Sequence, residues 1–184
     1  MRIFPCVAVA AILIPGAAHA SSMVIGSGFA RMCYEAADAE RATVGTIEAC
    51  DRALNEEALS FDDQVATFVN RGILRARTND MAGALADYDQ AIRLNPAQPE
   101  AYLNKGALVL KVQRDWRAAR DLFAAALERH TSRPEFAYFG RAITNELAGD
   151  YAAARADYQK ASEFAPKWDE PRKELMRFSV RKRG

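Results

Sequence analysis

The pattern of apolar and polar residues between 65 and 98 predicts two helices joined by a short turn. Small and apolar residues recur at helical spacing on both sides of Asn79-Asp80, a pair that favours a turn, and Asn95-Pro96 ends the second stretch. Proline ends a helix because it lacks the N–H group that the next turn requires. The residues that carry the pattern are Phe68, Gly72, Met81, Ala84, Tyr88 and Ala91.

The same pattern returns twice further along the chain. ALADYDQAIRLNP, at residues 84–96, is similar to ARADYQKASEFAP, at residues 154–166, and a third copy, ARDLFAAALERHT, begins midway at Ala119. A period of 35 residues is typical of stacked helical hairpins, each of which is too small to bury its apolar face alone. Small residues let the paired helices approach closely, and the aromatic residue is expected to fill the gap toward the next hairpin.

These residues resemble the tetratricopeptide repeat family, whose unit has an aromatic residue and Gly in its first helix and Ala, an aromatic, Ala and Pro in its second. Three units match, at about 65–98, 99–133 and 134–168. The resemblance implies an all-α, right-handed solenoid whose first helices line a concave groove. A helical bundle that repeats by chance is the alternative. The matching residues of the second unit are Tyr102, Gly106, Ala119, Phe123 and Ala126, and those of the third are Tyr138, Ala142, Ala154, Tyr158, Ala161 and Pro166.

Residues 1–20 have the features of a secretory signal peptide. Arg2 gives a basic start, residues 7–14 are an apolar run too short to span a bilayer, and Ala-His-Ala at 18–20 is a small-x-small cleavage motif. We expect cleavage after Ala20 and export, with a bacterial periplasm as the compartment. An uncleaved membrane anchor is the alternative.

Residues 21–64 are expected to form a further, degenerate helical hairpin. With a turn near 41–42, Cys33 and Cys50 are equidistant from the turn and face each other on antiparallel helices. A disulfide between them is geometrically possible and would stabilise the hairpin by about 3 kcal/mol. These two cysteines remain in an oxidising compartment once cleavage removes Cys6, and two buried free thiols are the alternative.

Residues 169–184 are predicted to form a capping helix and a basic tail. Trp168, Leu175 and Phe178 fall on one helical face opposite charged residues, and a solenoid needs such a cap over its last apolar face. The basic residues are candidates for contact with an anionic membrane surface, although a solvated helix end also explains them. They are Arg172, Lys173, Arg177, Arg181, Lys182 and Arg183.

Composition gives little support for catalysis or for nucleic-acid binding. Of 25 basic residues, 24 remain without Arg2, against 24 acidic ones, so no net charge attracts a polyanion. No nucleophile elbow, phosphate loop or metal-ligand spacing is present, and His130 is expected to lie on the surface at a helix end. Asp87 and Asp89 are expected to be exposed charges. We expect no catalytic residue, metal or cofactor, with a carboxylate-based enzyme as the alternative.

The resemblance implies a protein or peptide partner in the groove. Asn70 and Asn104 could bind the backbone of an extended peptide, because an amide both donates and accepts, although they could instead satisfy only neighbouring helix backbone. Phe136 and Phe139, beside Tyr138, are a candidate cluster of strong contacts, although one of them could instead pack into the longer junction between the second and third units. The expected function is an exported scaffold, and binding to an envelope surface through the basic tail is the alternative. The residues expected to face the groove are Val69, Asn70, Ile73, Arg77, Leu103, Asn104, Ala107, Lys111, Phe139, Ile143 and Glu146.

Overall fold

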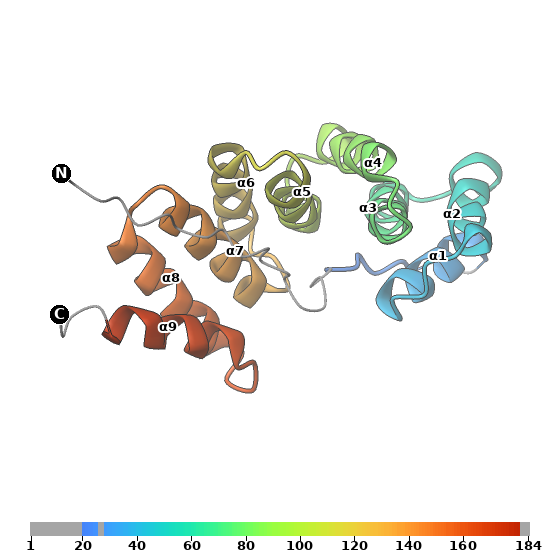
Figure 1. Cartoon of the computed structure of the whole chain (residues 1–184). Helices are drawn as coiled ribbons and strands as arrows, with labels where there is room; N and C mark the ends of the chain where they lie inside the picture. The colour runs from blue at the N-terminus through green and yellow to red at the C-terminus, as the bar shows by residue number, and fades with distance from the viewer. Residues whose placement is uncertain (1–19, 26–27, 181–184) are drawn as a thin grey trace.

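The computed structural model describes residues 20–25 and 28–180 of the chain, and this part consists of helices that follow a short extended segment (Figure 1). The helices are α1 (Phe29–Asp38), α2 (Val44–Glu56), α3 (Phe61–Arg77), α4 (Met81–Leu94), α5 (Pro99–Val112), α6 (Trp116–Glu128), α7 (Pro134–Leu147), α8 (Tyr151–Phe164) and α9 (Glu170–Val180).

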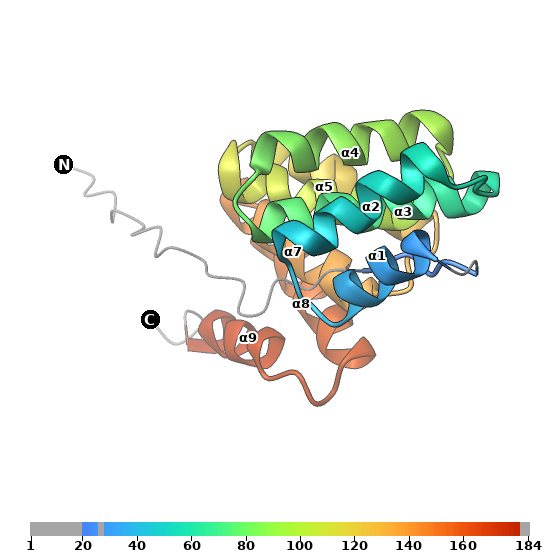
Figure 2. The ribbon, with the colours of Figure 1, turned by 90° about the vertical axis from the view of Figure 1, so that its right-hand side faces the viewer.

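Consecutive helices pack as hairpins, which stack in chain order from α1–α2 at one end to α7–α8 at the other (Figures 1 and 2). The first helices of successive hairpins, α1, α3, α5 and α7, also contact one another in that order and form a continuous row. Helix α9 packs on α8 and closes the stack. The predicted all-α solenoid of helical hairpins with a C-terminal capping helix is therefore confirmed.

The turn inside each repeat is built in the same way. An Asp side chain accepts a hydrogen bond from a backbone N–H in the first turn of the second helix, and the residue before it has a positive φ. Because these caps are 35 residues apart, the period of the sequence is also the period of the structure. The Asp residues are Asp80, Asp115 and Asp150, preceded by Asn79, Arg114 and Gly149 with φ values of 70°, 54° and 81°.

Close helix contacts depend on glycines that face buried aromatic rings. A Cβ atom on Gly72 would lie 2.5 Å from Cε1 of Tyr88, and one on Gly140 would lie 2.4 Å from Cζ of Phe123. Both rings are 1% exposed. Tyr88 thus packs on the glycine of its own hairpin. Phe123 reaches Gly140 of the next hairpin, which is the role that the sequence pattern predicts for the aromatic residue.

The N-terminal hairpin contains a disulfide between Cys33 of α1 and Cys50 of α2, with the two Cα atoms 4.9 Å apart. Both cysteines are fully buried in the cluster that also contains Val69 and Ile73 of α3. The bridge closes a loop of 17 residues, for which chain entropy gives a stabilisation of about 3 kcal/mol. It therefore fixes the hairpin that packs against the first repeat.

The C-terminal cap covers the last hairpin with apolar side chains. Trp168, Leu175 and Phe178 pack against the buried cluster that contains Phe139 and Tyr158, as the apolar face of this segment predicts. The cap therefore removes from water the apolar face that the end of a solenoid would otherwise expose.

We expect Gly140→Ala to lower the free energy of unfolding by about 1–3 kcal/mol, because the new Cβ would overlap the buried Phe123 ring. The matched control is Gly45→Ala in α2, where the nearest atom is 4.0 Å away at Thr43, and there a gain of up to about 1 kcal/mol is expected. Urea unfolding followed by circular dichroism measures both. Equal stability of the two variants would contradict the close contact.

Candidate functional site

The extended segment formed by residues 20–25 lies against α3 and α5, the first helices of two successive repeats (Figure 1). Asn70 of α3 accepts a hydrogen bond from the N–H of Ser22 at 2.9 Å and donates one to its C=O at 2.7 Å. Asn104 of α5 makes the same pair of bonds with Ala20, at 3.4 and 3.1 Å. Each amide therefore satisfies both backbone groups of one residue, and the two bound residues are two positions apart.

Side chains of the segment alternate between the protein and solvent, as in a β-strand. Ala20, Ser22 and Val24 are only 2%, 7% and 3% exposed, whereas Met23 and Ile25 are 71% and 86% exposed. The segment is therefore held by one face, and its other face remains open.

The three buried side chains occupy different surroundings. Ala20 belongs to the cluster that contains Leu103 and Phe123, and the hydroxyl oxygen of Ser22 accepts a hydrogen bond from Gln98 at 3.0 Å. Val24 lies in a separate apolar cluster formed by Ala30, Ala53 and Ala66, with Phe29, Tyr34 and Leu59 partly buried around it. The site thus accommodates two small side chains and one branched apolar side chain.

Two further hydrogen bonds hold the segment at its exposed positions. The hydroxyl of Ser21 donates to Asp38 at 2.9 Å, and the N–H of Ile25 donates to Asp63 at 3.0 Å. Both acceptors are carboxylates at the solvent boundary, so these two bonds, unlike the amide pairs, are exposed to water.

The third repeat does not continue the series of amides. Asn70 and Asn104 each follow the first aromatic residue of their repeat by two positions, and the equivalent residue in the third repeat is Gly140. Asn145 of α7 instead donates to Asp157 at 3.0 Å, inside its own hairpin. Among the three repeats, amide binding of the segment is thus restricted to α3 and α5.

Most other residues predicted to face the groove contribute to packing or to ion pairs. Ala107 is partly buried and Lys111 is exposed, both on α5 beyond Asn104. Arg77 pairs with Glu40 at 2.6 Å, and Glu146 pairs with Arg177 at 2.9 Å. The buried members, which belong to the apolar clusters between helices, are Val69, Ile73, Leu103, Phe139 and Ile143.

The aromatic residues of α7 that the sequence analysis offers as a cluster of strong contacts pack against later rings of the chain. The rings of Phe136 and Phe139 lie 4.9 and 4.7 Å from that of Trp168, and Tyr138 stacks on Phe164 at 5.6 Å. Their surfaces are consequently used within the chain. Trp168 thus contacts both Phe136 and Phe139 near the start of the third repeat, and this contact agrees with the alternative that the aromatic residues pack at the junction between the second and third repeats.

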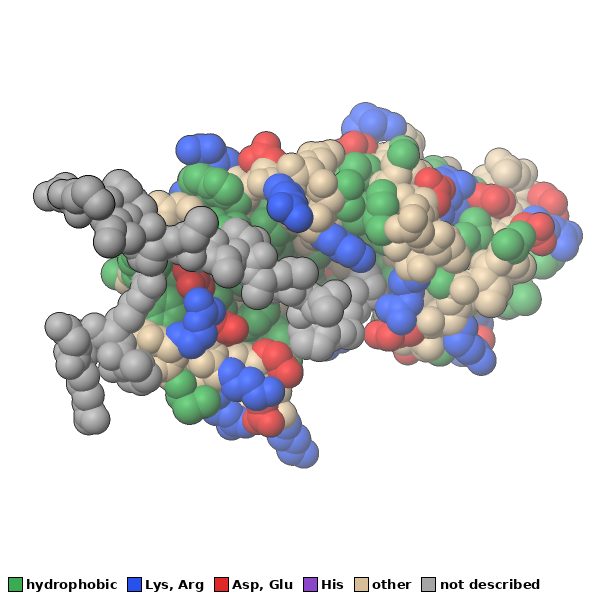
Figure 3. Space-filling view, viewed as in Figure 1, with side chains coloured by type: hydrophobic (Ala, Val, Ile, Leu, Met, Phe, Trp, Pro, Cys, Tyr) green, Lys and Arg blue, Asp and Glu red, His purple; other side chains and the backbone are tan. Residues whose placement is uncertain are grey.

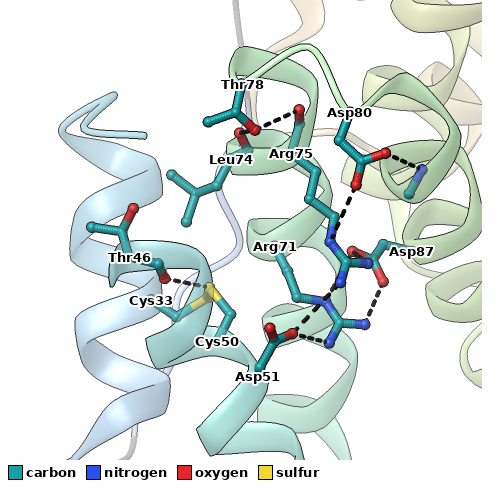
Figure 4. Close-up of polar contacts among 11 residues, drawn as sticks. Cys33, Thr46, Cys50, Asp51, Arg71, Leu74, Arg75, Thr78, Asp80 and Asp87 are labelled. Atoms are coloured by element: carbon teal, nitrogen blue, oxygen red, sulfur yellow. Dashed lines mark hydrogen bonds and ion pairs between the residues drawn. A yellow bond between two sulfur atoms is a disulfide. The ribbon is translucent and has the colours of Figure 1, made fainter. Parts of the chain in front are cut away.

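A buried ion-pair network holds α3 in position between α2 and α4 (Figure 4). Arg71 contacts Asp51 and Asp87 at 2.6 Å each, and Arg75 contacts Asp87 at 2.9 Å. Burial opposes a charged Arg71, yet its hydrogen bonds and the negative charges of Asp87 and Asp51 raise its pKa, so the guanidinium stays protonated. Asp87 is 3% exposed, which corrects the expectation of an exposed charge.

The same pair recurs in the third repeat, where Arg141 contacts Asp157 at 2.7 Å, while the second repeat has Leu122 at the position of the Asp. Arg71 directly follows Asn70 on α3. Because Arg71 is held from two sides, the rotation of α3 that points Asn70 at the extended segment is fixed.

The described tail residues are engaged locally. Arg172 and Lys173 pair with Asp169 and Glu170, and Arg177 pairs with Glu174 in addition to Glu146; Arg181, Lys182 and Arg183 lie outside the described residues. On the face drawn in Figure 3, basic and acidic side chains are interspersed.

No group of three or more metal-ligating side chains is present within residues 20–25 and 28–180. None of the helices in this part of the chain is long and apolar enough to cross a membrane. His130 lies in the turn after α6, with a φ of 59°.

Residues 20–25 are not predicted from the sequence as part of a site, because they fall at the junction between the expected leader and the expected hairpin. Small or apolar residues are buried at every second position, which is the period-two pattern of an extended strand. It spans too few residues to be distinguished from a linker by sequence alone.

Comparisons with known proteins agree with this fold. Residues 75–113 match the family model of the TPR repeat, and residues 105–167 match that of the tetratricopeptide repeat. The chain is 31% identical over 90 residues to Tetratricopeptide repeat protein 6 of Homo sapiens, which covers 49% of this chain but only 17% of that protein. A solved structure described as MamA RS-1 ArsTM double mutant is similar in fold, with a TM-score of 0.66 and 19% sequence identity. The similar region covers 86% of this chain and 87% of that structure's chain.

We expect Asn70→Ala to raise the amide hydrogen-exchange rate of Ser22 by roughly ten- to a hundredfold, because two hydrogen bonds worth about 0.5–1.5 kcal/mol each are lost. Nuclear magnetic resonance measures the rate. Asn145→Ala is the matched control, since its amide binds Asp157 and should leave Ser22 unaffected. An unchanged rate in Asn70→Ala would rule out the observed pairing.

Proposed function

The two family matches support a tetratricopeptide-repeat scaffold for protein–protein interaction, and we propose that this chain binds an extended peptide of a protein partner along α3 and α5, through Asn70 and Asn104. The observation that carries the proposal is that each amide binds both backbone groups of one residue in an extended segment. Backbone pairing of this kind provides affinity for any extended chain, and side-chain positions add specificity.

We propose a binding role rather than catalysis because of the chemistry of these groups. Asn70, Asn104 and Gln98, which contact the extended segment, carry amides that neither take up nor release protons near neutral pH. They are suited to hold a backbone in register and not to activate a nucleophile.

We also propose that the protein is exported and that it functions in a periplasm. The leader-like features of residues 1–20 support this, and so does the Cys33–Cys50 disulfide, because such bonds persist in oxidising compartments. The proposed cleavage after Ala20 would leave Ser21 as the first residue.

A photo-crosslinking residue at position 107 is expected to capture a discrete protein partner in whole cells. Ala107 lies on α5, one turn beyond Asn104, so both amides stay intact. The adduct should fall by about tenfold or more when Asn70→Ala is added, because two of the four hydrogen bonds between the Asn amides and the backbone are then lost. Mass spectrometry identifies and quantifies the adduct.

The control places the same residue at position 121 on α6, where the Asp121 side chain is 76% exposed. No groove-specific adduct is expected there. The proposed function fails if positions 107 and 121 capture the same proteins, or if Asn70→Ala leaves the adduct at position 107 unchanged.

Intact-mass measurement of the protein from cells is expected to give a chain that begins at Ser21 and is lighter than its reduced form by the two thiol hydrogens. Replacing Ala20 by Arg should block cleavage, since the peptidase site requires a small residue there. A chain that retains residues 1–20 in the membrane fraction would support the uncleaved anchor instead.

A further inference from the structure

Backbone contacts alone do not distinguish one extended peptide from another, so selectivity must come from the side-chain positions of the site. The segment of residues 20–25 occupies those positions in this structure and shows what each one accepts. The inference below rests on the proposed function, because it assumes that a partner peptide uses the same amides.

Two of the positions accept only small side chains. Ala20 and Ser22 are 2% and 7% exposed, and each belongs to the residue whose backbone is bound directly by an amide. A larger apolar side chain at Ser22 would lose the hydrogen bond that Gln98 donates to the hydroxyl. Ala20 packs in the cluster that contains Leu103 and Phe123, where inserted volume is destabilising.

The third position accepts a branched apolar side chain. Val24 is 3% exposed against Ala30, Ala53 and Ala66, whose short side chains leave room for it. A charged group at this position would be buried without a partner. By contrast, the positions of Met23 and Ile25 face solvent and impose no size limit.

We propose that the site selects peptides with the alternating pattern small-x-small-x-Val or Ile, and that residues 20–25, which carry this pattern as Ala-Ser-Ser-Met-Val-Ile, compete with the partner for it. A segment joined to its own binding site has an effective concentration in the millimolar range, so it excludes a free peptide of moderate affinity.

The proposed cleavage would weaken this competitor. Ala20 provides both backbone groups that bind Asn104, and it is the last residue of the expected leader. Removal of Ala20 leaves Ser22 on Asn70 but frees the amide of Asn104 for the partner. A partner peptide can then bind the free amide of Asn104 first and displace the rest of the segment from Asn70.

The test uses a fluorescent synthetic peptide, acetyl-ASSMVIG-amide, and the purified chain expressed with its own N-terminus. Val24→Asp in the protein expels the competing segment and changes no residue of the site itself. Fluorescence anisotropy should show that this variant binds the peptide at least about tenfold more tightly than the wild type does. Ser22→Pro, which removes one N–H donor outside every helix, is a second variant if circular dichroism shows that Val24→Asp has lost helix.

Matched peptides test the pattern. A peptide with Phe at the position of Ser22 should bind Val24→Asp at least about tenfold more weakly. A peptide with Lys at the position of Met23 should bind within about twofold, since that side chain is 71% exposed. Adding Asn70→Ala to the protein should weaken binding of the parent peptide by about tenfold or more, because the two hydrogen bonds of that amide are lost.

Four results would overturn the inference. If the Phe peptide binds as tightly as the parent peptide, the size rule is excluded. If wild type and Val24→Asp bind the parent peptide equally tightly, competition by residues 20–25 is excluded. If neither folded variant binds the parent peptide, both parts of the inference are excluded. A concentration-dependent dimer in light scattering that Val24→Asp abolishes would assign the segment to a second copy of the chain. If the crosslink at position 107 still yields an adduct sensitive to Asn70→Ala, the proposed function stands although this inference fails.

Discussion

The structure depends on the requirement that a buried amide must have both its donor and its acceptor satisfied. Asn70 is fully buried and Asn104 is 3% exposed, so neither side chain has free access to bulk water. A backbone residue of an extended chain provides one N–H and one C=O with the geometry that each amide needs. An unpaired amide at this depth would cost about 1–3 kcal/mol. This requirement explains why an extended segment lies across α3 and α5.

The orientation of these amides depends on a second set of buried polar contacts. Arg71 binds Asp51 and Asp87, and so connects α3 to the helices on both sides of it. Breaking such a buried pair by removing one partner costs about 3–5 kcal/mol, because the other charge remains buried. The Cys33–Cys50 disulfide fixes the hairpin that provides Asp51 and two of the alanines around Val24. Stability and peptide binding therefore share the same frame.

The periodic part of the structure could be predicted from the sequence, because helical hairpins repeat the same steric requirements every 35 residues. Gly72 and Tyr88 follow from that requirement, and so does the position of both Asn residues on first helices. The expectation that Asp87 is exposed is wrong, although the sequence contains a sign of its burial. The Asp-Tyr pair occurs in two repeats, and in both an Arg, Arg71 or Arg141, lies sixteen residues before the Asp. A charge that repeats with the core pattern is better explained by a buried pair than by a solvated surface.

The segment that occupies the site could not be predicted, because its position depends on contacts with residues 48 and 84 positions away. No local pattern in six residues encodes such distant partners. A packing contact explains why the third repeat differs, since Gly140 provides space for Phe123 and cannot also provide an amide. One position in the repeat therefore meets either a packing need or a binding need. In the first two repeats the residue at this position binds backbone, and in the third it lets the hairpins approach closely. Amide recognition across the three repeats is therefore limited to two alternate residues of a bound peptide.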